Sequence, residues 1–570
     1  MWYHIEKVVF LMRWNIKDKQ YFKPYLKMMT DKYKKIGIGP VMARLLMNRN
    51  CQYEDIKKLM TNPAACLEDP LKIAGCSAAG DAIIDLISNE IKIWVFGDYD
   101  VDGLTAGYIM TNYLKKLGAD VDVYYPERRE GYGLNEKFVN NLTEPCAIIT
   151  VDNGIAALAA IRCCREKGIP LIITDHHKPL TELTNSIVCD PHLSEDSAGH
   201  HLCGAAVAWK ICQYIDNKLG LSEAWKFTPY VAMGTIADVM PMTLENMIIV
   251  NVGLQLVSQG FAPNVKEYLK TMNIDKPVTE DIAWKIAPAL NACGRLGNVN
   301  LARKFLYHNG SKEELYKLIS EIDTLNKNRK IISANAVKDA MEQDYSNDAF
   351  CLFDATAYPT GISGIIAGKL VEAFNKPAVV YHRNSGTIWP ASMRSNGLDM
   401  LPYLERAKAY GDIYDYGGHS QACGISMLPD VESFRKRING YIRVPLEEFN
   451  KREKTIDVDM EISLSDVNRE LYNDITKIPT DHNLFPQPVF VIRNLKVHEV
   501  YHSSNNPNNI RLTLVDSDKE LYKLWAWNKD PLYRSLGSPD RIDIIGTVGT
   551  GFGNMANTIT FNVEDIKCCS

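Results

Sequence analysis

Acidic side chains and histidines gather in four short segments of the sequence, each expected at the end of a strand or in a loop. The four are Asp98-Tyr99-Asp100-Val101-Asp102-Gly103, Asp152-Asn153-Gly154, Asp175-His176-His177, and Asp238 within GTIADVMP. In an open parallel sheet, the carboxyl ends of the strands converge on one crevice. Carboxylates brought together there repel one another, so this cluster predicts bound cations that neutralise it.

The ligand types narrow the choice of metal. Aspartate oxygens with one or two imidazoles and no thiolate favour Mn²⁺ or Mg²⁺ over structural zinc. Two such ions roughly 3.5–4 Å apart would suit the attack of water on a phosphodiester, because they activate the water and stabilise the charge that develops on phosphate. Any one segment alone would be ordinary turn chemistry. The four together predict a metal-dependent phosphoesterase.

The pattern of apolar residues predicts a sheet that could place these segments side by side. Short apolar runs typical of strands alternate with helical segments from Ile91 onward. The predicted strands are 91–96, 121–125, 147–151, 170–174 and 186–190, and the helices are 105–118, 156–168 and 205–220. Gly118, Gly168 and Gly220 stand where the helices should end. This βαβ rhythm predicts a doubly wound parallel sheet over residues 91–255, with helices on both faces.

The remaining regions complete the predicted α/β architecture. Residues 1–90 form a helical N-terminal lead-in, and residues 256–345 form a helical connector whose long helix spans about 311–344. A smaller α/β lobe follows at 346–447, with strands at 351–355 and 378–382 and a glycine-rich segment near 417–424. Residues 455–570 hold five short strands with polar turns, which predict a small β-barrel of the OB type.

The bulk composition allows this interpretation and excludes others. At 570 residues the chain needs several domains. No apolar run is long enough to cross a membrane, and Glu6 and Lys7 interrupt the apolar N-terminus, so we expect no membrane span, no signal peptide and a cytoplasmic location. Fourteen scattered cysteines without a Cys-x-x-Cys pair argue against a zinc ribbon and a disulfide framework. The net charge of −5 means that a nucleic-acid enzyme must concentrate its Lys and Arg at the groove.

The four acidic segments, in this order, resemble the signature motifs of the DHH phosphoesterases. Other segments are similar to those of the RecJ exonucleases within that family: LCGAAVAWK, LNACGRLG, GISGIIAGKL, ASMRS and GGHSQACG, with GGH marking the accessory DHHA1 lobe. PVMARLLMNRN, NIRLTLVD and FNVEDI fit the RecJ lead-in and OB domain, so the resemblance covers nearly the whole chain. It implies a 5′-to-3′ exonuclease specific for single-stranded DNA that uses two Mn²⁺ or Mg²⁺ ions in DNA repair or recombination. It also implies a monomer, with a helicase or a single-strand-binding protein as a candidate partner.

Two alternatives stay open at this point. A nanoRNase or cyclic-dinucleotide phosphodiesterase shares the DHH and DHHA1 lobes but acts on small substrates, and the extra barrel of this chain argues against it. A non-catalytic nucleic-acid-binding scaffold, as in eukaryotic replication helicases, has a decayed DHH site, whereas no expected ligand is missing here.

The resemblance also assigns roles at the metal site. Asp98, Asp100 and Asp152 would hold one ion, and Asp102, Asp152, His176 and Asp238 the other, so that Asp152 bridges the two. His177 would face the scissile phosphate as a hydrogen-bond donor or proton carrier. Asp175 would orient a histidine from behind, as ligating imidazoles usually require. Asp98 departs from the pattern of related families, in which a histidine takes its place.

Substrate contacts follow from the other motifs. Arg295 in NACGRLG would grip the scissile phosphate, because a guanidinium adds both charge and orientation, and Asn291 of the same motif would contact the substrate. Ser392 and Arg394 in ASMRS resemble the family's pocket for a terminal 5′ phosphate, which would make the enzyme start at an end. Arg128 would assist, or Arg129 instead, because PERREGYG is one residue shorter than the usual spacing. His419 in GGHSQACG would border the same cleft across the gap between the lobes.

The predicted barrel offers aromatic side chains to a single strand. Tyr501, Trp525 and Trp527 are candidate stacking platforms, with Lys523 and Arg511 nearby. Bases stack on aromatic rings while cationic side chains meet the phosphates. The alternation in LYKLWAW is equally typical of a strand core, so a packing role is the alternative for each aromatic residue.

Overall fold

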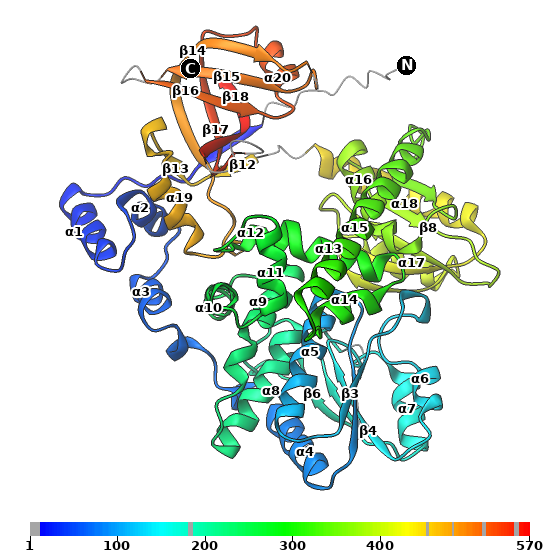
Figure 1. Ribbon diagram of the computed structural model, residues 1–570. Coiled ribbons are helices and arrows are strands. Elements are labelled where there is room, and N and C mark those ends of the chain that lie inside the picture. Colours follow the sequence, from blue (N-terminus) through cyan, green and yellow to red (C-terminus); the bar gives the residue numbers. More distant parts are fainter. Residues whose placement is uncertain are drawn as a thin grey trace. The chain divides into compact units, whose positions relative to one another are not determined.

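The structure is a computed structural model that describes residues 12–179, 186–451, 455–481, 484–504, 506–515, 520–551 and 558–569 (Figure 1). The apolar N-terminal segment considered above as a signal peptide lies mostly outside the described residues. By its contacts the chain divides into two units, one of residues 1–68, 239–252 and 453–570 and the other of residues 69–238 and 253–452. None of the helices in the described ranges combines the length and the apolar character that crossing a membrane requires.

A five-stranded parallel sheet forms the first lobe of the larger unit, in the order β3-β2-β4-β5-β6. Its strands are β2 (Lys92–Phe96), β3 (Val121–Tyr124), β4 (Cys146–Val151), β5 (Leu171–Thr174) and β6 (Ile187–Cys189). Its helices are α4 (Cys76–Ser88), α5 (Val101–Lys116), α6 (Glu136–Asn141), α7 (Leu158–Glu166), α8 (Gly204–Leu219) and α9 (Thr228–Ala237). Every residue of β4 is buried, as expected of a central strand in a parallel sheet. The strand order reverses between β2 and β4, and open α/β sheets bind ligands at such a switch point.

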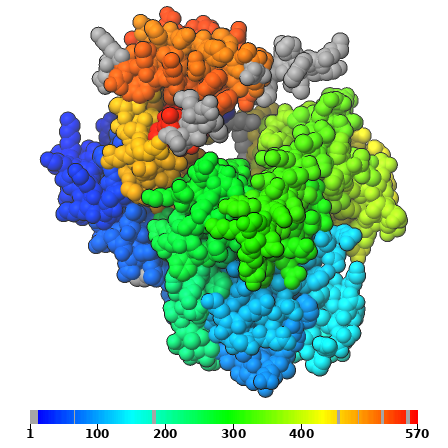
Figure 2. Space-filling view, in the orientation of Figure 1, coloured from blue at the N-terminus to red at the C-terminus, as the bar shows by residue number. Residues whose placement is uncertain are grey.

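Helices connect this lobe to the second one. They are α10 (Leu244–Gln259), whose residues up to Val252 belong to the smaller unit, and α11 (Pro263–Thr271), α12 (Thr279–Asp281), α13 (Ala287–Arg295), α14 (Val299–Leu306) and α15 (Lys312–Met341). The long predicted helix is α15, whose capping box pairs the Ser311 side chain with the Glu314 backbone. The boundary expected between residues 255 and 256 falls inside α10. Figure 2 shows the connector helices in green as a continuous surface with the first lobe in blue and cyan, where α13 and α14 pack against α5.

The second lobe of the larger unit is a mixed sheet in the order β10-β11-β9-β8-β7. Its strands are β7 (Cys351–Asp354), β8 (Ala378–Tyr381), β9 (Trp389–Arg394), β10 (Ile413–His419) and β11 (Ala422–Met427), and its helices are α16 (Ser363–Phe374), α17 (Leu401–Ala409) and α18 (Val431–Asn450). Only β7 and β8 run parallel; the other pairs are antiparallel. The glycine-rich segment near 417–424 is the β10–β11 hairpin.

The smaller unit combines N-terminal helices with a C-terminal sheet in the order β16-β15-β14-β17-β18, to which β13 adds beside β14. Its helices are α1 (Lys23–Lys34), α2 (Pro40–Asn48), α3 (Tyr53–Thr61), α19 (Arg469–Thr476) and α20 (Asp530–Ser535). Its strands are β1 (Arg13–Ile16), β12 (Thr455–Val458), β13 (Met460–Glu461), β14 (Phe490–His502), β15 (Ile510–Val515), β16 (Leu521–Ala526), β17 (Arg541–Thr550) and β18 (Ile559–Cys568). The lead-in is therefore not purely helical, because β1 pairs in parallel with β12.

Candidate active site

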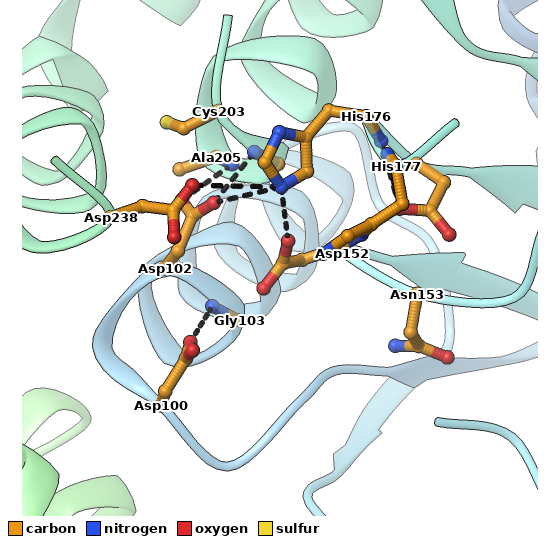
Figure 3. A network of polar contacts seen from close by, with 12 residues as sticks. Asp100, Asp102, Gly103, Asp152, Asn153, His176, His177, Cys203, Ala205 and Asp238 are labelled. Carbon is orange, nitrogen blue, oxygen red and sulfur yellow. Dashed lines mark hydrogen bonds and ion pairs between the residues drawn. The ribbon is translucent and has the colours of Figure 1, made fainter. Parts of the chain in front are cut away.

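Neighbouring strands and two helix ends bring the acidic segments together (Figure 3). Asp98 follows β2, Asp152 follows β4, and Asp175 and the two histidines follow β5. Asp100 caps the start of α5, where its carboxylate accepts a hydrogen bond from the Gly103 backbone at 3.1 Å. Asp152 adopts a left-handed backbone with φ of 63°, which is uncommon outside glycine and is often found at functional sites.

Asp238 corrects one part of the sequence prediction. It was expected at the end of a strand or in a loop; it lies in the turn directly after helix α9, so the element that it follows is a helix and not a strand. A helix end can reach the same crevice, because α9 packs against α5 and α8. Unlike the buried Asp152, Asp238 lies at the rim, where 37% of its side chain is exposed.

His176 lies at the centre of the cluster. Its Nε2 atom is 3.2 Å from Oδ1 of Asp152, 3.8 Å from Oδ2 of Asp238 and 3.9 Å from Oδ2 of Asp102. Potential ligand atoms lie within 4.8 Å of one another in three sets: Asp98, Asp100 and Asp152; Asp102, His176 and Asp238; and Asp152, His176 and His177. All six expected ligands are therefore brought together, with Asp152 between the first two sets.

The electrostatics of the cluster fit divalent cations. Burial, reinforced by repulsion from neighbouring aspartates, raises the pKa of Asp98, Asp100 and Asp152 above the ordinary carboxyl range. The Oδ1 atom of Asp98 is buried without a hydrogen-bond partner in the described part of the chain. Carboxylates in such surroundings are stable as anions only when a cation sits among them, and oxygen-rich sets with an imidazole suit Mn²⁺ or Mg²⁺. The residues present therefore fit two such ions.

Asp102 is held in place by the start of helix α8. Its two carboxylate oxygens accept hydrogen bonds from the backbone N–H groups of Gly204 at 2.7 Å and Ala205 at 2.9 Å. A helix N-terminus favours negative charge through its dipole and its free N–H groups. Gly204 also leaves room for Asp152, because a Cβ atom at residue 204 would lie 2.4 Å from the Asp152 side chain.

Asp175 and His177 form a hydrogen-bonded pair beside the metal ligands. Asp175 is buried and accepts hydrogen bonds from the backbone of Ile155, His176 and His177, and its Oδ1 atom is 2.8 Å from Nδ1 of His177. Burial opposes the charge of His177, but the hydrogen bond and charge of Asp175 outweigh it and raise the pKa of His177 to about 9. Without bound metal, His177 is therefore a cationic hydrogen-bond donor at neutral pH. The histidine whose side chain Asp175 orients is His177, which we expect to face the phosphate.

Arg295 is the last residue of helix α13. Its Nη1 atom donates a hydrogen bond to the Gly361 carbonyl of the second lobe at 2.9 Å. Burial lowers the pKa of the Arg295 guanidinium to about 10. Asp100 opposes this shift, whereas three other guanidinium groups add to it, those of Arg128, Arg329 and Arg394. The positive charge of Arg295 is therefore influenced both by other guanidinium groups and by the acidic cluster.

Arg128 and Arg129 differ in their surroundings. The Arg128 guanidinium lies over the ring of Tyr99 at 4.6 Å, and its Nε atom is buried without a hydrogen-bond partner in the ranges the structure describes. Arg129 is exposed. Its burial makes Arg128 the stronger candidate, and the contact of either residue with a 5′ phosphate stays a prediction.

The other expected substrate residues differ in where they lie. Ser392 and Arg394 lie two residues apart on β9 and so share one face of the sheet, opposite the core residues Ala391 and Met393.

Asn291 accepts a hydrogen bond from the Val101 backbone at 3.1 Å and so anchors the start of α5. His419 is exposed at the end of β10, and among the described residues it makes no polar contact with the acidic cluster. Its place at the cleft stays a prediction.

Two residues near the site were not identified from the sequence. The Tyr132 hydroxyl donates to the Asp152 carbonyl at 3.2 Å and lies 3.4 Å from Nδ1 of His177. Arg329 lies half-buried on α15, with its guanidinium bonded to the Asn326 side chain. Tyr132 belongs to the segment PERREGYG, which also contains Arg128, so it could have been identified as a candidate site residue from the sequence. Arg329 had no local signal, because nothing distinguishes it from the other charged residues of a long polar helix.

Aromatic residues of the smaller unit form a row across three strands. Tyr501 on β14 is opposite Arg511 on β15, which is opposite Trp525 on β16. The Arg511 guanidinium lies 4.9 Å from the Tyr501 ring and 5.9 Å from the Trp525 ring. Trp525 and Trp527 stack with centroids 5.0 Å apart, and Tyr501 and Trp527 are 43% and 40% exposed. These side chains form a surface row, which favours the stacking hypothesis over a purely internal packing role.

Three known domain families match consecutive regions of the chain. The DHH family N-terminal domain matches residues 92–235, the DHHA1 domain matches 348–444, and the RecJ OB domain matches 458–565. A single-stranded-DNA-specific exonuclease RecJ from Bacillus subtilis is 30% identical over 97% of this chain and 70% of its own length.

Solved structures show the same fold. The crystal structure of RecJ from Thermus thermophilus in complex with Mn²⁺ superimposes with a TM-score of 0.81 at 22% identity, over 98% of this chain and 80% of that one. A second structure, exonuclease RecJ bound to manganese, has a TM-score of 0.58 at 28% identity and covers 65% of this chain and 95% of its own. From these matches and the site geometry, the chain belongs to the RecJ family of exonucleases.

Proposed function

We propose that this protein is a metal-dependent exonuclease that degrades single-stranded DNA from a 5′ end. The observation that carries the proposal is the convergence of six acidic and histidine ligands in the first lobe, with Arg295 held by the Gly361 carbonyl of the second lobe. Residues that bind cations lie next to an arginine that can bind an anion, and this arrangement suits a substrate whose phosphate contacts both the metal ions and the guanidinium group. The relatives described as specific for single-stranded DNA support the choice of substrate.

Two ions would divide the ligands between them. Asp98, Asp100 and Asp152 would hold one, and Asp102, His176 and Asp238, with Asp152 shared, the other. When bound there, Mn²⁺ or Mg²⁺ ions would lower the pKa of an attacking water and neutralise charge on the phosphate oxygens. The backbone contacts of Asp102 and the left-handed backbone of Asp152 hold these carboxylates in place before any ion arrives.

The protein's own groups would position the phosphate. His177, held by Asp175, would donate a hydrogen bond to a phosphate oxygen or pass a proton to it. Arg295, tethered to the Gly361 carbonyl, would hold the scissile phosphate with the remaining donors of its guanidinium. The donors are placed before the substrate binds, which is how electrostatic preorganisation lowers a barrier.

Recognition of the chain end would come from the second lobe. Ser392 and Arg394 on β9, with Arg128 from the first lobe, would bind the terminal 5′ phosphate. A terminal phosphate carries a charge of about −1.5 to −2 at neutral pH, more than the single charge of an internal phosphodiester. A cationic pocket therefore favours an end over the middle of a strand.

The aromatic row of the smaller unit supports a long substrate. Tyr501, Trp525 and Trp527, with Arg511 between the strands, offer ring faces and charge to several nucleotides of a single strand. A dinucleotide phosphodiesterase would have no use for such a surface. Comparing rates on a dinucleotide and on a 30-mer separates the two functions, and a strong preference for the dinucleotide would overturn the proposal.

The direct test is digestion of end-labelled single and duplex DNA and RNA with Mn²⁺, Mg²⁺ or EDTA. We expect single-stranded DNA to be shortened from the 5′ end in either metal and to be left intact in EDTA. The Asp152→Ala variant should fold and lack this activity. Activity that is unchanged in Asp152→Ala, or insensitive to EDTA, would refute the site.

The cellular setting is part of the proposal. A single-strand-specific exonuclease needs an exposed single strand, which a helicase or a single-strand-binding protein would supply. We expect the chain to act as a monomer in the cytoplasm, in DNA repair or recombination. Sedimentation of the purified protein with and without an oligonucleotide would test the monomeric state.

A further inference from the structure

A short segment at the start of helix α16 contacts two of the arginines assigned to the substrate. The Gly361 carbonyl accepts the hydrogen bond from Nη1 of Arg295 at 2.9 Å. A Cβ atom added at Gly364 would lie 2.8 Å from Nη2 of Arg394, so the Arg394 guanidinium lies close against this backbone. Residues 361–364 therefore meet the arginine proposed for the scissile phosphate at one end and the arginine proposed for the terminal phosphate at the other.

Two buried polar side chains hold this segment. Ser363 is 3% exposed, and His382, which directly follows β8, is 4% exposed. The Ser363 hydroxyl donates to the Thr360 carbonyl at 2.6 Å, and its oxygen lies 2.6 Å from Nε2 of His382. Because the hydroxyl has only one proton, the Nε2–H of His382 is the donor in the second hydrogen bond. The imidazole, the hydroxyl and the carbonyl thus form one chain of hydrogen bonds at the turn that contains Gly361.

The surroundings of this pair are apolar. Ile362 and Val380, close to it in sequence, belong to a buried core of the second lobe. Buried hydrogen-bonding groups cost free energy unless each is paired, so a satisfied pair specifies one geometry. The His382 backbone N–H donates to the Pro390 carbonyl on β9 at 3.0 Å, and β9 is the strand that carries Arg394. The pair therefore ties the turn before α16 to the sheet.

We propose that His382 and Ser363 are positioning residues that set the spacing between the two phosphate-binding arginines and so match the site to a strand with a 5′ phosphate. The inference rests on the proposed function, because it takes Arg295 and Arg394 as the contacts of the scissile and the terminal phosphate. A displacement of about 1 Å in a positioning group can lower a rate about a hundredfold. A strand that lacks the 5′ phosphate is held at only one of these two points, so its rate should depend less on their spacing.

The test compares Ser363→Ala and His382→Leu with a matched control, Tyr345→Phe. Tyr345 is buried in the same core as Ile362, and its hydroxyl donates to the Ala340 carbonyl at 2.9 Å. Tyr345→Phe therefore also removes one hydroxyl and one buried hydrogen bond from this lobe. For each protein, kcat/KM is measured with Mn²⁺ on oligonucleotides that begin with a 5′ phosphate or a 5′ hydroxyl.

We expect Ser363→Ala and His382→Leu each to lower kcat/KM about tenfold on the 5′-phosphate strand and by a smaller factor on the 5′-hydroxyl strand. Tyr345→Phe should leave both values unchanged. The double variant should be no slower than the slower single variant, because the two side chains act as one unit. Wild-type activity in Ser363→Ala, equal losses on both strands, or additive losses in the double variant would overturn the inference.

His382→Gln is the conservative variant. Its side-chain amide can donate to the Ser363 hydroxyl in place of the imidazole Nε2–H, so it should keep most of the activity that His382→Leu loses. Equal losses in His382→Gln and His382→Leu would contradict a role based on this hydrogen bond. Thermal unfolding shows which variants fold, and Ser363→Ala, the smallest change, decides the matter if His382→Leu does not.

A second readout does not depend on catalysis. The Ile362 backbone N–H donates to the Pro359 carbonyl at 3.2 Å in the turn that contains Gly361. This amide hydrogen should exchange with solvent faster in Ser363→Ala than in wild type, and at the wild-type rate in Tyr345→Phe. If the wild-type protein cuts no DNA but the exchange depends on Ser363, the proposed function fails while the anchoring of the turn stands. If the wild-type protein cuts DNA and Ser363→Ala leaves the exchange unchanged, the role of Ser363 fails by itself.

Discussion

Gly361 is the point at which the second lobe touches Arg295. Its carbonyl accepts the hydrogen bond from Nη1 of Arg295, and the two backbones are in close contact. A Cβ atom at residue 361 would lie 2.1 Å from the Arg295 carbonyl oxygen, 2.6 Å from its Cα atom and 2.7 Å from its carbonyl carbon. All three are backbone atoms, so no side-chain rotation can relieve the contact. Gly361→Ala therefore tests whether the position of Arg295 matters.

The size of the effect follows from these distances. Non-bonded carbon and oxygen atoms rarely come much closer than about 3 Å, so the turn before α16 and the end of α13 must separate by about 1 Å. Overpacking of this kind typically costs about 1–3 kcal/mol of stability. A displacement of about 1 Å in a positioning group can lower a rate about a hundredfold, which corresponds to about 2.7 kcal/mol in the barrier. We expect a folded protein with a strongly reduced kcat/KM.

The assay measures kcat/KM on a 5′-phosphorylated single strand with Mn²⁺, together with thermal unfolding. The matched control is Gly368→Ala, also in the α16 region, where a Cβ atom meets nothing within 4 Å. Alanine favours a helix over glycine, so this control should be about 0.5–1 kcal/mol more stable and fully active. Gly361→Ala with wild-type kcat/KM would refute the argument that the second lobe sets the position of Arg295.

Three further predictions concern other parts of the protein. Burial raises the pKa of Asp190 to about 7, so the contribution of the protonated Asp190 carboxyl to stability is complete below its unfolded pKa and is lost as the pH rises through 7. In urea titrations, the free energy of unfolding of Asp190→Asn should equal that of wild type near pH 4 and exceed it by up to about 4 kcal/mol at pH 8. Equal stability of the two proteins at pH 8 would contradict this. In Gly204→Ala the new methyl group would lie 2.4 Å from the Asp152 side chain and displace this metal ligand, so calorimetry should show at least tenfold weaker Mn²⁺ binding. Unaltered Mn²⁺ affinity would contradict the claim that Gly204 makes room for Asp152. Replacing Trp525 or Trp527 by Ala should weaken binding of an oligo(dT) by about 1–3 kcal/mol in fluorescence anisotropy with EDTA, whereas unchanged binding would return both residues to a packing role.

The sequence predicts the parts of this molecule that local patterns determine. The strands that end at Asp98, Asp152 and Asp175 are short apolar runs followed by polar turns, and β2, β4 and β5 lie where the pattern placed them. Gly118, Gly168 and Gly220 follow helices with positive φ, as expected from their spacing. Because parallel strands end at one edge, the meeting of these segments could be inferred without a structure.

The parts that the sequence did not predict depend on tertiary packing. Asp238 and Arg295 lie at helix ends, since the helical periodicity of each segment continues to the functional residue. Arg329 lies among the charged residues of α15, and only the folded structure shows that it is half-buried whereas its neighbour Lys330 is exposed. The pairing of β1 with β12 joins segments that are more than 430 residues apart, which no local pattern can reveal.

The central claim is that carboxylates distant in the sequence hold a pair of hard cations with Asp152 between them. Titration of the metal-free protein with Mn²⁺ in a calorimeter tests this claim most directly. We expect two ions per chain for the wild type and weak or no binding for Asp152→Asn, because one shared ligand is lost from both positions. Binding of a single ion, or of two ions with unchanged affinity in Asp152→Asn, would contradict it.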